Sequence, residues 1–365
     1  MLACPVCAGH GVEQHVLPYP SFRHLDFAPI GPGPVRLGRC AGCGLVFRMS
    51  DPADAAAVLA RYRDAAYVNA TPAPHMIAAD GFPGPVPQTV LQAKLLAPAL
   101  PSQARILDIG CANGALLRAF ADRGGVDDLC GFDVSERPAF PRGAPFRFVA
   151  GDLRRVEGMF DLVVLSHALQ YVPDLAALFE QIGARLAPGG AVFIQVPDFA
   201  QKAAALLFGD LFWHFTPAVL SNVLQRLGFA VEAAQTACFP RDVLVLARPD
   251  PAARSTTPPA DDAIADAAAA LRRMADALAR FPVAEQTGVL GTTIDASFAA
   301  SLLGSRVTFF VDENPEKIGG TFRGLPIVAP RAVSASAAVA VPLGPAGARV
   351  SVRLAQKNPG QWIAV

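Results

Sequence analysis

The stretch that decides the fold is Arg105–Phe120, "RILDIGCANGALLRAF". An apolar run ends in Asp108, passes through Gly110 and Gly114, and becomes an amphipathic helical pattern. A glycine after a strand lets the backbone approach a ligand closely, because no side chain fills the space. The helix N-terminus at the same corner suits a carboxylate or a phosphate. The stretch therefore predicts a strand, a glycine turn and a helix, although a turn that serves only packing also fits it.

Strands and helices alternate around this stretch, from residue 102 to residue 250. Alternation of this kind indicates a mostly parallel sheet with helices on both faces. The predicted fold class is α/β, with a doubly wound Rossmann-like core. The expected strands span 105–110, 128–135, 146–152, 160–167, 191–198 and 242–250, and the expected helices span 114–124, 174–190 and 215–229.

A chain of 365 residues is long enough for two or three domains. Residues 1–52 are rich in Gly and Pro, carry two cysteine pairs, and predict a small zinc-binding domain. Residues 53–250 hold a helical lid and the α/β core. Residues 251–365 begin with a Pro/Ser/Thr-rich linker, continue with an Ala-rich helix, and end in a smaller α/β unit.

The composition favours a small-molecule partner. Lys plus Arg and Asp plus Glu both number 31, and a neutral chain has no electrostatic footprint for a polyanion. The N-terminus "MLACPVCAGH" shows no targeting pattern, and no stretch is long and apolar enough to cross a bilayer. We expect a cytoplasmic protein with neither a nucleic-acid nor a membrane partner, and we leave the oligomeric state open.

Acidic residues recur where the next strands are expected to end. Asp133 closes "GFD" and Asp152 lies in "GDL". At these positions one acid can accept both hydroxyls of a ribose and the next can accept from the exocyclic amine of adenine. A dinucleotide dehydrogenase is disfavoured, because its GxGxxG run needs a third glycine and gives no reason for "GDL" or "SHALQYV".

The ordered runs "LDIGCANG", "GFD", "GDL", "FDLVVLSHALQYVPD" and "RLAPGGAVFIQVPD" resemble class I S-adenosylmethionine-dependent methyltransferases over 105–248. The resemblance implies that cofactor, with its methionine end at the glycine turn, its ribose at Asp133, its adenine at Asp152, and Ser166 or His167 beneath the sulfonium. Ala112 stands where many relatives carry a glycine. The implied cofactor-binding residues are Asp108, Gly110, Cys111, Ala112, Gly114, Asp133, Val134, Asp152, Leu153, Ser166 and His167.

Four cysteines near the N-terminus form two CxxC pairs. They are Cys4 with Cys7 and Cys40 with Cys43. Four thiolates can close a tetrahedral shell around zinc and leave no position for water, so the predicted site is structural. Redox thiols or unligated core cysteines are the alternatives. A zinc ribbon can also bind nucleic acid, but this segment lacks clustered Lys and Arg.

The cysteine segment, the core and the later run "VDENPEKIGGTFRGLPIVAP" together resemble the zinc-containing nucleotide-deoxysugar C-methyltransferases. That resemblance implies a sugar nucleotide held with the help of the C-terminal unit. In this unit Gly288, Gly291 and Asp312 repeat the strand, turn, helix, strand and acid order, without the dense glycines of a phosphate cradle. Sugar-nucleotide binding and a role as scaffold or dimer surface both stay open.

The family's Glu-His pair is missing from the corresponding stretch "FGDLFWHFTPAVL", where Asp210 and Leu211 stand instead. Because leucine cannot take a proton, oxygen and nitrogen methylation compete with carbon methylation. We expect His214 to be the first candidate base, since an imidazole titrates near neutral pH. Asp210 and His167 are further acid/base candidates. The alternatives are a packing role for His214 and a role for His167 in shaping the cofactor floor.

The run "RYRDAAYVNATP" carries two tyrosines, Tyr62 and Tyr67, where the resemblance implies a lid over the substrate. Tyr67 is the better catalytic candidate, and the alternative is that both rings bury one helix face. The sequence therefore predicts a methyltransferase of a small, sugar-like or nucleotide-linked acceptor. An O- or N-methyltransferase of another metabolite and a non-catalytic cofactor-binding protein are the other hypotheses.

Overall fold

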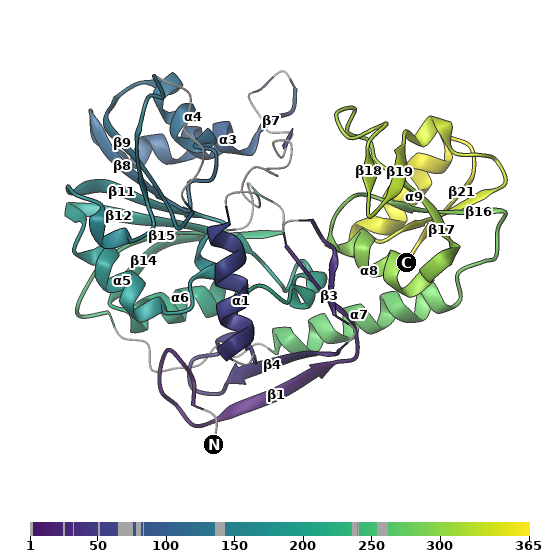
Figure 1. Cartoon of the computed structure of the whole chain (residues 1–365), viewed down its shortest axis with the longest axis horizontal. Helices are drawn as coiled ribbons and strands as arrows, with labels where there is room; N and C mark the ends of the chain where they lie inside the picture. The colour runs from purple at the N-terminus through teal and green to yellow at the C-terminus, as the bar shows by residue number, and fades with distance from the viewer. Residues whose placement is uncertain are drawn as a thin grey trace. The chain divides into compact units, whose positions relative to one another are not determined.

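Figure 1 shows a computed structural model of the whole chain. Its contacts divide the chain into a first unit, 1–15, 37–201 and 212–260, and a second unit, 16–36, 202–211 and 261–365. The domain boundaries expected at residues 52 and 250 stay predictions. The structure describes residues 3–24, 26–31, 33–49, 52–64, 76–77, 82, 84–135, 143–235, 239, 241–253 and 262–365.

The first unit contains a seven-stranded sheet in the order β10-β9-β8-β11-β12-β15-β14. The first five strands are parallel, and β15 is antiparallel to both neighbours. The order reverses between β8 and β11, and a crevice forms at the carboxyl ends of strands at such a point. The predicted doubly wound α/β core is confirmed. The strands are β8 (Ala104–Ile109), β9 (Val126–Asp133), β10 (Arg147–Ala150), β11 (Phe160–Ser166), β12 (Leu186–Pro197), β14 (Phe229–Gln235) and β15 (Asp242–Pro249).

Alternating side chains of this sheet feed two hydrophobic clusters, one on each face. On β11, Val163 and Leu165 belong to one cluster and Leu162 and Val164 to the other. Helices α5 and α6 supply the first cluster, and α3 and α4 supply the second. This two-sided burial holds the strand ends in place. The helices are α3 (Gln88–Leu96), α4 (Ala115–Arg123), α5 (Leu175–Gly183) and α6 (Pro217–Arg226).

The structure differs from the expectation at two elements of this core. The helix expected over 174–190 ends at Gly183, and "LAPGG" belongs to β12. The register between β11 and β12 shifts there, and a Cβ at Gly190 would lie 2.9 Å from two carbonyl oxygens, so the glycines serve an irregular strand pairing. Strand β14 was not expected because its alanines and glutamate have low β propensity.

The four N-terminal cysteines lie in the first unit, whereas residues 16–36 between the two pairs are assigned to the second. Strands β1 (Val12–Leu17), β4 (Val35–Cys40) and β5 (Val46–Arg48) form a sheet that β13 (Trp213–His214) completes. Within α6, Asn222 Nδ2 donates to the carbonyl of Cys43 at 3.1 Å, and Arg226 donates to that of Gly42 at 2.7 Å. Cys4, Cys40 and Cys43 share a hydrophobic cluster with α5 and α6.

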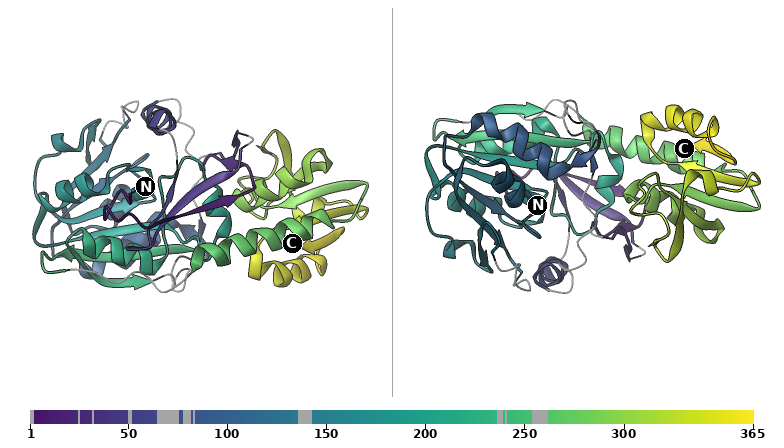
Figure 2. Two further views of the ribbon diagram at one scale, coloured as in Figure 1. Left: turned by 90° about the horizontal axis from the view of Figure 1, so that it is seen from below. Right: turned by 90° about the horizontal axis from the view of Figure 1, so that it is seen from above.

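The second unit contains a smaller sheet in the order β18-β19-β17-β16-β20-β21, green to yellow in Figure 2. All of its strands are parallel except β18, which is antiparallel to β19. This confirms a second, smaller α/β fold. Its main elements are α7 (Ala263–Ala279), β16 (Gln286–Leu290), α8 (Ile294–Leu303), β17 (Val307–Val311), β18 (Thr321–Phe322), β19 (Leu325–Val328), β20 (Ala337–Val341), α9 (Gly347–Ala355) and β21 (Gln361–Ala364).

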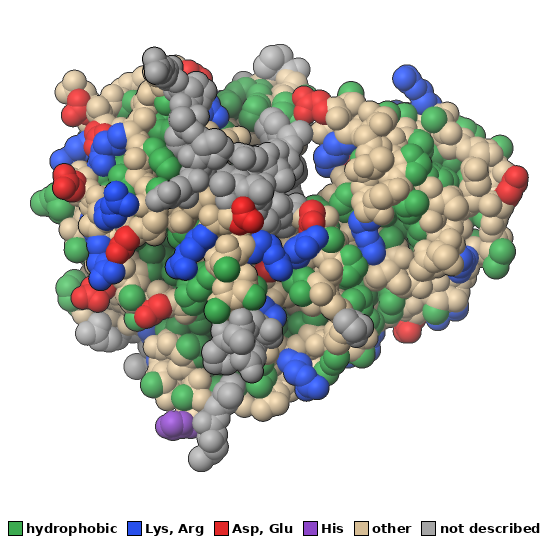
Figure 3. Space-filling view, viewed as in Figure 1, with side chains coloured by type: hydrophobic (Ala, Val, Ile, Leu, Met, Phe, Trp, Pro, Cys, Tyr) green, Lys and Arg blue, Asp and Glu red, His purple; other side chains and the backbone are tan. Residues whose placement is uncertain are grey.

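Basic and acidic side chains are interspersed over the face drawn in Figure 3. Within the described part of the chain, every helix is too short or too polar to cross a bilayer.

Short elements complete the chain. They are β2 (Ser21–Phe22) and β3 (Pro29–Gly31) of the second unit, and α1 (Pro52–Arg63), β6 (Met76–Ile77) and β7 (Val86–Pro87) of the first.

Candidate functional site

The glycine turn after β8 has a left-handed backbone at three positions. The φ angles of Gly110, Ala112 and Gly114 are 78°, 51° and 73°. A Cβ at Gly110 would lie 2.6 Å from the Cβ of Ala168, which follows β11 closely in the chain. Only glycine fits this approach. The turn is thus held against the end of the neighbouring strand, at the point where the strand order reverses.

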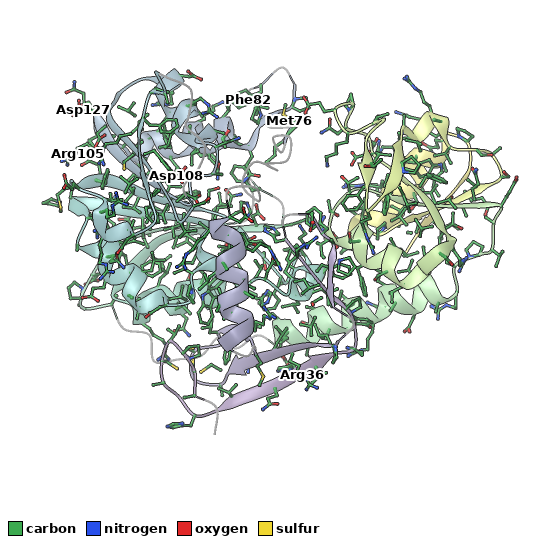
Figure 4. The ribbon with its side chains drawn as sticks, in the orientation of Figure 1. Arg36, Met76, Phe82, Arg105, Asp108 and Asp127 are labelled. Atoms are coloured by element: carbon green, nitrogen blue, oxygen red, sulfur yellow. The ribbon has the colours of Figure 1, made fainter. Side chains whose placement is uncertain are left out.

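Two buried aspartates lie at the ends of β8 and β9. Asp108 is 3% exposed and Asp133 is 7% exposed. Burial and the charge of Asp133 raise the pKa of Asp108 to about 7. Asp133 accepts from the backbone N–H of Ala112 at 3.4 Å and of Ser135 at 3.2 Å. A cationic ligand would relieve the repulsion between the carboxylates, and this fits the ammonium and sulfonium groups of S-adenosylmethionine. In Figure 4, Asp108 lies further inside the unit than Arg105 and Asp127, which are labelled at its edge.

Asp152 follows β10, so the three expected aspartates stand at the ends of three adjacent strands. The carboxylate of Asp152 accepts from the backbone N–H of Arg154 at 2.9 Å and from its guanidinium at 2.8 Å. These hydrogen bonds lower the pKa of Asp152. Leu153 is buried beside it, and Val134 is 38% exposed. Leu153 thus offers an apolar surface and Asp152 a charged acceptor.

A polar network occupies the carboxyl end of β11. Gln92 Nε2 donates to Ser166 Oγ at 2.7 Å and to Gln195 Oε1 at 2.6 Å. Gln195 Nε2 donates in turn to Asp242 Oδ2 at 2.6 Å. His167 has a left-handed φ of 54°, and its backbone N–H donates to the carbonyl of Gln195. The network joins α3, β11, β12 and β15.

The imidazole of His167 contacts this network through one nitrogen. Nε2 lies 3.3 Å from Asp242 Oδ2, 3.3 Å from Gln88 Nε2 and 3.4 Å from Gln195 Nε2. Nδ1 is buried and has no hydrogen-bond partner among the residues that the structure describes. The sequence predicted Ser166 and His167 but missed Gln92, Gln195 and Asp242. The spacing of Gln88 and Gln92 on one helix face was the only local signal.

Two other acid/base candidates belong to different units of the chain, His214 to the first and Asp210 to the second. His214 is 3% exposed on β13, and burial with the charge of Arg48 lowers its pKa to about 3. Such an imidazole is neutral, which favours the packing alternative over a base. Asp210 lies in the second unit, where its carboxylate accepts twice from the backbone N–H of His24, both at 3.0 Å. These contacts tie Asp210 to the segment between β2 and β3.

Of the two tyrosine candidates, Tyr62 lies within the described residues and Tyr67 does not. The ring of Tyr62 on α1 packs against Tyr171, with centroids 4.5 Å apart. This contact fits the alternative in which the ring buries a helix face. Tyr67 lies outside the described residues.

The four N-terminal cysteines converge. Their Sγ atoms all lie within 4.8 Å of one another, with 3.6 Å between Cys4 and Cys43 and 3.4 Å between Cys7 and Cys40. These separations exceed a disulfide bond of about 2 Å. Zn–S bonds of about 2.3 Å in a tetrahedron place sulfurs roughly 3.8 Å apart, so the cluster fits a structural zinc ion.

Comparisons with known proteins match part of this chain to methyltransferases. Residues 88–234 match the family described as "Methyltransferase domain". A trans-aconitate 2-methyltransferase of Deinococcus radiodurans is 35% identical over 98 residues, covering 26% of this chain and 38% of that protein. A ubiquinone biosynthesis O-methyltransferase of Pseudomonas aeruginosa is 34% identical over 110 residues, 27% of this chain and 47% of that protein. The chain thus spans less than half the length of these relatives.

Among solved structures, an S-adenosylmethionine-dependent methyltransferase from Mesorhizobium loti is similar at a TM-score of 0.35 and 24% identity. The match covers 42% of this chain and 96% of that one. The family match extends from α3 to β14 and includes the glycine turn, the aspartates and most of the polar network. The part of this chain that is similar to methyltransferases is therefore residues 88–234.

Proposed function

We propose that this protein transfers a methyl group from S-adenosylmethionine to a small-molecule acceptor. One observation carries the proposal: the buried pair Asp108 and Asp133 flanks the glycine turn, where Asp133 accepts from the N–H of Ala112 and the strand order of the sheet reverses. Open α/β sheets bind ligands at this point. When bound, the cofactor supplies an electrophilic methyl group on a cationic sulfonium.

The residues around the turn have distinct roles in this proposal. Asp108 and the turn hold the methionine end, where the ligand's positive charge offsets the buried carboxylates. Asp133 accepts the ribose hydroxyls while it keeps the N–H of Ala112, since a carboxylate accepts several hydrogen bonds. Leu153 packs against the adenine, and Asp152 shares its carboxylate between the adenine amine and Arg154.

The acceptor that we propose is small and bears hydroxyl groups, with a nucleotide-linked or other sugar as the first choice from the resemblance. Leu211 is buried and apolar where the sugar C-methyltransferases carry the histidine base, so carbon methylation has the weaker support. The name of one relative, an O-methyltransferase, favours oxygen. A zinc ion at the four cysteines would stabilise the first unit and take no part in transfer.

The test of the proposal is calorimetric titration of the zinc-loaded 365-residue chain with S-adenosylhomocysteine. We expect one site per chain. A flat trace from folded protein would overturn the proposal. Methyl-labelled S-adenosylmethionine with a metabolite extract then separates an enzyme from a binding protein, because only the enzyme yields a labelled product.

The zinc proposal has its own test. Elemental analysis is expected to give one zinc per chain, and Cys43→Ser is expected to lose both the metal and much of the thermal stability. Full zinc occupancy in the variant would show that the metal lies elsewhere.

A further inference from the structure

We infer that Asp242, supported by Gln195 and Gln92, is a positioning residue that fixes the proton of His167 on Nε2, so that Nδ1 can take a proton from a hydroxyl acceptor. The catalytic part of this inference rests on the proposed function. The positioning part rests on the network alone.

The contacts of Asp242 determine the tautomer. Its Oδ2 lies 3.3 Å from His167 Nε2 and already accepts from Gln195 Nε2 at 2.6 Å. The amide nitrogens of Gln88 and Gln195 also lie 3.3 Å and 3.4 Å from Nε2, but Gln195 already donates to Asp242. A carboxylate can only accept and makes the stronger, charge-assisted hydrogen bond, so this contact favours a proton on Nε2. Nδ1 then holds the lone pair, and it has no partner within the described part of the chain. An acid that orients an imidazole in this way is a recurrent arrangement in general-base catalysis.

The two glutamines hold Asp242 and His167 in one orientation. Gln195 is fully buried and Gln92 is 1% exposed. Both ends of the Gln195 amide are used, since Nε2 donates to Asp242 and Oε1 accepts from Gln92. The left-handed backbone of His167 is strained for a residue with a side chain, and its N–H is tied to the Gln195 carbonyl. Strain of this kind persists only where the surroundings impose it.

The imidazole lies at the corner proposed for the cofactor. His167 directly precedes Ala168, the residue against which Gly110 packs. On the neighbouring strands, Asp108 is in register with Val164, two residues before Ser166. The base and the methyl donor would therefore meet at the carboxyl ends of β8 and β11.

The chemistry defines the acceptor class. His167 Nδ1 takes the hydroxyl proton as an oxygen lone pair forms the bond to the methyl carbon. The carbon–sulfur bond breaks, and its electron pair stays on sulfur. The products are a methyl ether, S-adenosylhomocysteine and an imidazolium next to Asp242. An acceptor that is already anionic needs no base. The network therefore indicates an acceptor with a neutral hydroxyl, such as a sugar or a phenol.

The test uses protein labelled with ¹⁵N-histidine and long-range ¹H–¹⁵N NMR, without any ligand. The chain has six histidines, and His167→Gln assigns the signal. In the wild type we expect the Nε2–H form to exceed the other by at least about tenfold, because a charge-assisted hydrogen bond selects it. An Nδ1–H form in the wild type would overturn the inference, whatever the variants do.

The variants separate positioning from folding. Asp242→Asn is expected to lose most of the tautomer preference, and Asp242→Glu to restore part of it. Glu232→Gln is the matched control, because it removes one exposed carboxylate from the neighbouring strand β14. The control should keep the wild-type spectrum. An unchanged tautomer in folded Asp242→Asn would contradict the inference.

A separate titration of Asp242→Asn with S-adenosylhomocysteine should give an affinity within about twofold of the wild type, since Asp242 does not hold the ligand. A loss of affinity in this variant alone would make Asp242 part of the cofactor site and refute the positioning role. If the wild type itself does not bind, the proposed function fails while the tautomer result stands.

Discussion

The two sheets of this protein use the same order of strand, turn, helix, strand and acid, but they treat the acid differently. In the first sheet, Asp108 and Asp133 are both buried beside a turn with three left-handed residues. In the second, Asp312 follows β17, accepts from Thr292 Oγ1 at 2.9 Å and lies 3.5 Å from Lys317 Nζ. The second acid thus has partners in the loops that follow β16 and β17 of its own unit.

This difference shows that the topology of the sheet sets where a site can form. The charges at the strand ends then determine whether a cationic ligand is favoured there. A pair of buried carboxylates favours a cation, whereas an acid beside a lysine has its counter-charge already. Gly291 also turns in open space, with no atom within 4 Å of an added Cβ. We therefore propose the adenosyl site for the first sheet only. Sugar-nucleotide binding by the second unit stays a prediction.

The largest expected effect comes from the two turn glycines. In Gly110→Ala the new Cβ would lie 2.6 Å from Ala168, so the turn must move, and we expect affinity for S-adenosylhomocysteine to fall by more than about 100-fold. Gly291→Ala meets no neighbour and should cost only about 1–2 kcal/mol of backbone strain. Calorimetry and urea unfolding measure the two effects. Equal affinities in the two variants would contradict the proposal that only the turn of the first sheet binds the ligand.

The two second-strand acids give the next effect. Asp133→Ala removes two hydrogen bonds from ribose hydroxyls to a charged acceptor, and a loss of about 3 kcal/mol corresponds to roughly 100-fold in affinity. Asp312→Ala should leave the affinity unchanged and lower the stability by about 1 kcal/mol, because Thr292 and Lys317 lose a partner. Weaker S-adenosylhomocysteine binding in Asp312→Ala would give the second sheet a part in the site.

The pH dependence of binding tests whether the charge of Asp108 favours a cationic ligand. The pKa of Asp108 is about 7 in the ligand-free protein, above its usual value, so it is protonated at lower pH. A cation prefers the ionised form, and we expect affinity for S-adenosylmethionine to rise about tenfold from pH 5.5 to 7.0. The same raised pKa makes the contribution of Asp108 to stability increase as the pH falls from about 7 toward 4. Asp108→Asn should remove the binding trend, and a flat wild-type profile would contradict it.

The smallest effect tests another buried titratable group of the first unit, His214. The pKa of His214 falls from 6.5 to about 3 on folding, so its contribution is present above pH 6.5 and is lost as the pH falls toward 3. His214→Leu should therefore gain about 1 kcal/mol over the wild type at pH 5.5, compared with pH 7.5. Urea unfolding at the two pH values measures this. Acid sensitivity that is the same in both proteins would show that His214 is not buried as a neutral ring.

The sequence predicted the part of the candidate site that is local in the chain. Asp108, Gly110 and Asp133 follow directly from a strand that ends in an acid or a glycine. The polar network escaped prediction because its hydrogen bonds join residues 47, 74 and 103 positions apart. Glutamines on a helix and within an apolar strand give no pattern until the sheet brings them together.

By itself, the sequence determined the α/β class, the glycine turn and the convergence of four cysteines, because backbone freedom, periodicity and CxxC spacing are properties of short segments. Only the tertiary structure decided which groups are ionised and which meet. The pairing of β13 with β5 buries His214, and the packing of α3 and β15 against β12 unites Gln92, Gln195 and Asp242 around His167. Burial and neighbouring charge set the pKa of a side chain, and both depend on residues that are distant in the chain.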